Sequence, residues 1–172
     1  MEKIKFKTLL FDIACSSMAC DGHIDDREIK ELKEIDKTTP YFRDVDLSKR
    51  LNRFVESYKD DSEKTIETVI DQLNDSSLNL VEEMLVLEIA LRIVYSDTKI
   101  DPKEVDYLKS IRSGMSIGNK MLLERFGVID FLFDEKEIID LTKDPVGKTI
   151  DSADLTNLEN LYFIPDDKRE SK

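Results

Sequence analysis

The stretch IACSSMACDGHIDDREIKELKEI (residues 13–35) decides the fold, because it recurs in degenerate form as IALRIVYSDTKIDPKEVDYLKSI at residues 89–111. An offset of 76 residues aligns the two copies without a gap and places Asp21 over Asp97. Apolar matches carry little weight, since any two amphipathic helices share them. Acids that recur in register within a helix-junction-helix pattern weigh more and indicate an internal repeat. We therefore expect two similar helical hairpins that pack about a pseudo-twofold axis.

Helical periodicity extends over nearly the whole chain. The apolar residues of the first segment follow one stripe at steps of three and four: Phe6, Leu9, Leu10, Ile13 and Ala14. The same spacing predicts helices over residues 47–59, 62–73, 79–96, 102–112 and 120–133. We find no alternating strand pattern bounded by turn residues. The expected fold class is all-α, with two pseudo-symmetric helix-junction-helix halves that form one bundle-like domain.

The length and composition suit one domain with a sizeable core, since the chain has 172 residues of which 40% are hydrophobic. We place this all-helical domain at residues 1–142, with the two repeats at about 10–36 and 86–112. The helical periodicity of the apolar residues becomes irregular from about residue 143 onward. For residues 143–172 we expect an irregular extension, with a short docked helix at LTNLENLYF and then a frayed tail.

The charge balance is strongly acidic, because 38 acidic and 26 basic residues give a net charge of −12. Such a chain repels phosphate backbones and anionic membranes, which argues against nucleic acid and favours cations or basic surfaces as partners.

No run approaches the ~20 apolar residues of a transmembrane helix, and Asp12 interrupts the apolar start that would otherwise resemble an export signal. Cys15 and Cys20 suit small buried side chains in a reduced cytoplasm, the alternative being a soft-ligand or redox pair.

The first junction resembles the second half of a calcium-binding loop. If Gly22 takes the sixth position of an EF-hand loop, the acids that follow it match the later ligand positions. The first and third positions, however, are Ser17 and Ala19, which carry no carboxylate. A standard EF-hand is therefore rejected.

Helix capping explains much of the motif. Asp25-x-x-Glu28 and Asp101-Pro102-x-Glu104 are capping boxes in which Asp takes the place of Ser or Thr. In each box the Asp accepts a backbone N–H and the Glu reaches back to the cap. Pro102 takes the first helical position, where its missing donor costs nothing. These four acids need no ligand.

Asp21 and Asp97 are harder to explain by capping. Each follows a helix C-terminus, where a carboxylate faces the negative end of the helix dipole at a cost of about 0.3–1 kcal/mol. Because this unfavourable placement occurs twice, we expect a compensating cation or compensating hydrogen bonds. The residues alone do not decide between these two explanations. Gly22 suits the left-handed residue that ends a helix.

MACDGHIDDREI and its partner VYSDTKIDPKEV resemble the duplicated acidic motif of the TerB family, the tellurite-resistance class that includes the N-terminal domain of DjlA-type proteins. The resemblance spans roughly residues 5–130. It implies an all-helical fold of two pseudo-symmetric halves. It also implies a cluster of acids that binds a divalent cation.

Carried onto this chain, the resemblance implies a cation site made of six acids: Asp21, Asp25, Glu28, Asp97, Asp101 and Glu104. Oxygen ligands favour Ca²⁺, Mg²⁺ or Mn²⁺. The implied function is that of a non-enzymatic, cytoplasmic stress-response protein that binds the cation, a protein partner or both. A membrane-associated complex is one candidate partner, without insertion into the membrane. Two alternatives remain open: a metal-independent helical scaffold that docks a membrane or signalling partner, and a metal-dependent hydrolase.

Overall fold

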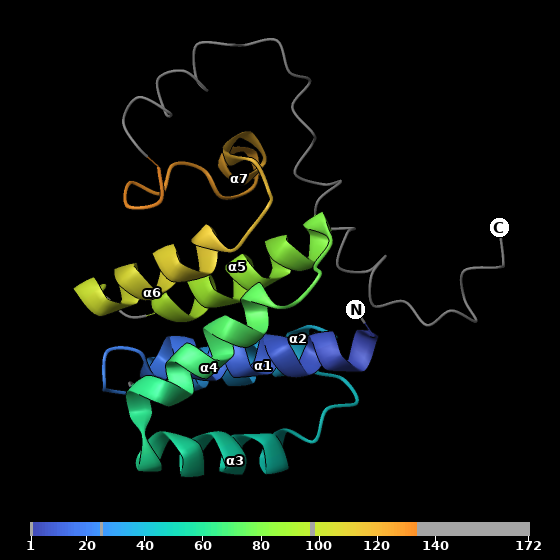
Figure 1. The fold of residues 1–172 in the computed structure, drawn as a ribbon, viewed down its shortest axis with the longest axis vertical. Helices are drawn as coiled ribbons and strands as arrows, with labels where there is room; N and C mark the ends of the chain where they lie inside the picture. The colour runs from blue at the N-terminus through green and yellow to red at the C-terminus, as the bar shows by residue number, and fades with distance from the viewer. Residues whose placement is uncertain (1, 25, 97–98, 134–172) are drawn as a thin grey trace, which may run out of the picture. The chain divides into compact units, whose positions relative to one another are not determined.

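The computed structural model describes residues 2–24, 26–96 and 99–133, and these residues form helices with no strand among them. In chain order the helices are α1 (Lys3–Ala19), α2 (Asp26–Thr38), α3 (Leu47–Asp60), α4 (Ser62–Asn74), α5 (Leu80–Val94), α6 (Pro102–Ser113) and α7 (Asn119–Phe126). Figure 1 shows these helices in chain order, coloured by residue number. The prediction of an all-α fold is confirmed.

The chain divides into two compact units. The first, Met1–Ser116, holds α1 to α6, and the second begins at Ile117 and holds α7. The predicted domain end at residue 142 and the extension at 143–172 lie outside the described residues, so both stay predictions. Among the described residues, no helix has both the length and the hydropathy needed to cross a bilayer.

Helix α1 lies at the centre of the first unit. It packs along α5 and also contacts α2, α3 and α4. The sequence predicted that one apolar stripe of α1 is buried. Its neighbours on several sides also bury residues outside that stripe, including Phe11, Cys15 and Met18. A helix buried on all sides belongs to a domain core, and this burial also encloses the polar side chain of Asp12, which is 3% exposed.

The two helix junctions have corresponding boundaries. Helix α2 begins at Asp26 and α6 begins at Pro102, 76 residues later, while α1 and α5 end at Ala19 and Val94, within one residue of the same offset. Gly22 has the predicted left-handed backbone, with φ of 93°, and its N–H donates to the carbonyl of Ala19 at 3.1 Å. Superposition of the complete halves stays a prediction.

The helix predicted over residues 120–133 was wrong in its second half. Helix α7 ends at Phe126, and the residues from 127 to 133 are loop and turn. Gly127 has φ of 73° and donates its N–H to the carbonyl of Leu123 at 2.9 Å. A positive φ with an extended ψ of −167° is open to glycine but rarely to residues with a side chain, so the chain leaves the helix here even though apolar residues continue the spacing.

Candidate functional site

The second junction contains the predicted capping box. Oδ1 of Asp101 accepts the N–H of Lys103 at 2.9 Å, and Oε2 of Glu104 accepts the N–H of Asp101 at 2.6 Å. Pro102 occupies the first helical turn. Glu104 is 5% exposed, so one of its carboxylate oxygens serves the helix start from within the protein. Asp25 of the first box lies outside the described residues.

Because the Asp101 cap acts through backbone donors, Asp101→Ala should lower the free energy of unfolding by about 0.5–2 kcal/mol without any metal present. Urea denaturation of chelator-treated protein measures this loss. Asp36→Ala, at an exposed position inside α2, is the control and should change stability by less than about 0.5 kcal/mol. Equal stabilities of parent and Asp101→Ala would remove the capping role and leave ligation as the explanation for this acid.

The first junction folds back toward the second. Oδ1 of Asp21 accepts the N–H of His23 at 2.7 Å, which stabilises the turn after α1. Nζ of Lys103, in α6, donates to the carbonyl oxygen of Asp21 at 3.2 Å. The start of α6 therefore lies against the end of α1, although the two are far apart in the sequence.

The pKa of the Cys20 thiol, at the end of α1, is affected by the charges of the acids at the two junctions. Its pKa is raised from 9.0 to about 12, and burial is the largest cause. The further causes include the negative charges of three candidate acids: Glu104, Asp21 and Glu28. Glu28 and Glu104 are also buried, at 4% and 5% exposed. The structure thus brings described candidate acids from both junctions into one neighbourhood.

The six-acid set is only partly described. Asp25 and Asp97 lie outside the described residues, so their positions relative to the other four acids stay predictions. Within residues 2–24, 26–96 and 99–133, no group of three or more His, Cys, Asp or Glu side chains has the geometry to hold a metal ion.

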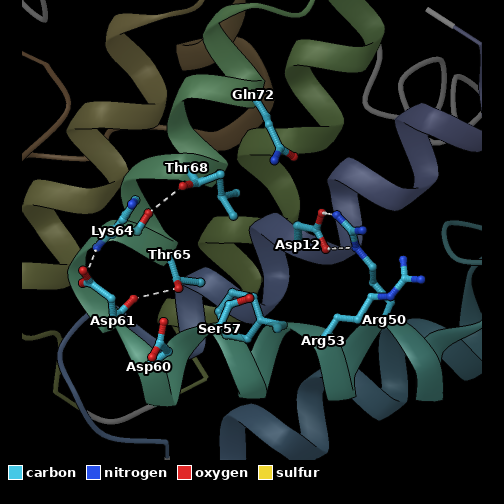
Figure 2. Close-up of a pocket in the computed structure, with 12 residues that line it drawn as sticks. Asp12, Arg50, Arg53, Ser57, Asp60, Asp61, Lys64, Thr65, Thr68 and Gln72 are labelled. Carbon is cyan, nitrogen blue, oxygen red and sulfur yellow. Dashed lines mark hydrogen bonds and ion pairs between the residues drawn. The ribbon is translucent and has the colours of Figure 1, made fainter.

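Sequence reasoning missed a charged pair beneath a cleft between α3 and α4. Figure 2 shows Asp12 of α1 facing Arg50 of α3, whose Nε donates to Oδ1 at 2.6 Å and whose Nη2 donates to Oδ2. Burial raises the pKa of Asp12, and the hydrogen bond and positive charge of Arg50 oppose that rise. The acid that interrupts the apolar start of the chain was the available signal, but its partner lies 38 residues away.

The cleft above this pair has a volume of about 430 Å³ and a polar wall. The hydroxyls of Thr65 and Thr68 lie on this wall and donate to the carbonyl oxygens of Asp61 and Lys64, one turn earlier in the chain. Ser57 also lines the cleft, but no histidine does. The cleft therefore lacks the paired nucleophile and imidazole base that acyl transfer commonly uses.

Comparison with known proteins identifies the family. No curated protein and no solved structure gives a significant match to the chain. The family model described as tellurite resistance protein TerB matches residues 9–122, which is more than half of the chain and includes both helix junctions. The chain belongs to the TerB family.

Proposed function

We propose that this TerB-family protein is a non-enzymatic stress-response protein that binds a divalent cation through the acids of its two helix junctions. The observation that supports the proposal is the contact between Lys103 and the Asp21 carbonyl, which brings the two junctions together, and the negative charges of Asp21, Glu28 and Glu104 all act on the nearby Cys20 thiol. Carboxylates that share one neighbourhood repel each other, and a bound cation relieves that repulsion. Carboxylate oxygens as ligands favour the hard cations Ca²⁺, Mg²⁺ or Mn²⁺.

Capping and ligation are compatible at the second junction. The cap engages Oδ1 of Asp101, whereas an ionised carboxylate offers about four acceptor positions on two oxygens. Asp101 can therefore hold the start of α6 and contribute to a cation site. Asp25 and Asp97 complete the proposed ligand set.

Cation binding should raise the melting temperature of chelator-treated protein, because a ligand that binds only the folded state stabilises it. At a cation concentration of about one hundred times Kd, the expected gain is about 2.7 kcal/mol. Differential scanning calorimetry with Ca²⁺, Mg²⁺ and Mn²⁺ measures the shift. A metal-independent scaffold would show none.

The substitutions that test the ligands are Asp21→Asn and Asp97→Asn, made together, since Asn keeps the size and the acceptor oxygen of Asp. Without metal this double variant should be at least as stable as the parent, because carboxylate repulsion and an unfavourable dipole contact are removed. With metal it should lose the gain. Asp36→Asn with Asp75→Asn, two exposed positions outside the junctions, removes the same charge and should keep the gain. Equal metal responses in the parent and the junction variant would contradict the proposal.

A further inference from the structure

A second groove of about 410 Å³ lies between α4 and α6 and has an apolar floor. Ile66 and Ile70 of α4 line it and are half-buried, and the buried ring of Tyr107 lines it from α6. Cys20, at the end of α1, also lines it. Its half-buried side chain adds a small surface to the groove beside the isoleucines.

The rim of the groove is acidic. Exposed carboxylates stand on both walls, with Glu67 and Asp71 on α4 and Asp106 on α6. They face one cation at the rim, Lys103, whose ammonium also donates to the carbonyl of Asp21. The groove therefore pairs an apolar floor with a rim of net negative charge.

We propose that this groove docks a basic amphipathic segment of another protein, with apolar side chains on the floor and Lys or Arg side chains along the rim. An amphipathic helix that lays its apolar face into a groove is a common mode of peptide recognition. Opposite charge at the rim fixes orientation and speeds association. The proposal goes beyond the proposed function, and it does not depend on cation binding.

The negative charge of the rim favours a basic partner over the other possible occupants of the groove. A second copy of the chain carries the same net charge of −12, so its approach is opposed. The chain's own segment at 143–172 contains more acidic than basic residues and does not complement the rim. Nucleic acid and anionic membranes are repelled for the same reason.

The probe for the test is a synthetic amphipathic peptide of about four helical turns, with Leu on one face and Lys on the other, labelled for fluorescence anisotropy. The same peptide with Glu in place of Lys is the charge control. All titrations contain chelator, so that failure of docking and failure of cation binding give separate results. We expect the Lys peptide to bind at least about tenfold more tightly than the Glu peptide.

The rim is tested by two variants of equal net charge. Glu67→Gln with Asp71→Asn and Asp106→Asn should weaken binding of the Lys peptide about tenfold, since three exposed charge pairs at the rim are lost. The matched control neutralises three exposed acids elsewhere, Glu34→Gln, Asp36→Asn and Glu56→Gln, and should change Kd by less than about twofold. Equal weakening by both variants would show attraction to bulk charge only and would overturn the proposal.

The floor is tested by Ile66→Ala with Ile70→Ala. Loss of apolar area in the groove should weaken the Lys peptide by about tenfold or more. Ile4→Ala, at a position 46% exposed on α1, is the control and should leave Kd unchanged. Undiminished binding to the floor variant, or no binding of the Lys peptide to the parent, would also overturn the proposal. The rim variants change surface residues alone, so they test the groove even if the floor variant does not fold.

Discussion

Replacing Arg50 with methionine should lower the free energy of unfolding by about 3 kcal/mol at pH 7, one of the two largest effects expected in this protein. The change removes both hydrogen bonds to Asp12 and leaves a carboxylate that is 3% exposed without its cation. A buried carboxylate without a partner bears the full cost of desolvation. Urea denaturation monitored by circular dichroism measures the loss.

The loss should shrink as the pH falls. The pKa of Asp12 in the folded protein is raised above its ordinary value of 3.8, chiefly by burial, so the folded state holds this proton more tightly than the unfolded state does. Stability therefore decreases as pH rises from about 4 through the raised pKa. Removal of Arg50 takes away the two influences that lower this pKa, and the variant should recover part of its stability on acidification at a higher pH than the parent does.

Two variants separate the ion pair from simple packing. Arg53→Met, one turn along α3 at an exposed position, should change stability by less than about 0.5 kcal/mol. Asp12→Leu with Arg50→Met removes both charges and should recover most of the 3 kcal/mol, because an apolar pair of similar size often replaces a buried ion pair at little cost. A double variant as unstable as Arg50→Met would refute the account based on an unpaired charge.

The contrast between Asp101 and Asp12 explains what the sequence could and could not predict. The role of Asp101 depends on residues within three positions of it, and such local backbone chemistry is readable from a motif. Asp12 depends on Arg50 in another helix. An acid that interrupts the apolar start of the chain is visible in the sequence, but only tertiary packing identifies its partner.

Burial of side chains could likewise be predicted where it depends on local spacing, but not where it depends on tertiary packing. Periodicity predicted that Leu9 and Ile13 face a core, and both do. It did not predict that Phe11 and Met18, on other sides of the same helix, are also buried, because that depends on how many neighbours α1 has. The apolar spacing also continued past Gly127, where the backbone conformation of one residue ends α7. At the candidate site, the TerB resemblance implied a cluster of acids from both junctions, while the Lys103 contact to Asp21 needed the structure.

Truncating the equivalent isoleucines of the two repeats should produce the other large loss of stability. Ile13 in α1 and Ile89 in α5 align at the offset of 76, and both are 0% exposed in helices that pack together. Ile→Ala at either position should lower the free energy of unfolding by about 2–5 kcal/mol, through lost apolar burial and the cavity left behind. Equilibrium denaturation in urea measures both variants, and Ile→Val, with an expected loss of about 0.5–1.5 kcal/mol, keeps the comparison possible if an alanine variant fails to fold.

The comparison of the two losses tests the pseudo-symmetry. If the halves are structurally equivalent, Ile13 and Ile89 occupy similar surroundings, and their losses should agree to within about 1 kcal/mol. Ile24→Ala, at a junction position 50% exposed, is the control for removing the same atoms outside the core and should cost much less. Losses at Ile13 and Ile89 that differ by several kcal/mol would show that the repeat preserves the helix boundaries and the acids without preserving the packing around them.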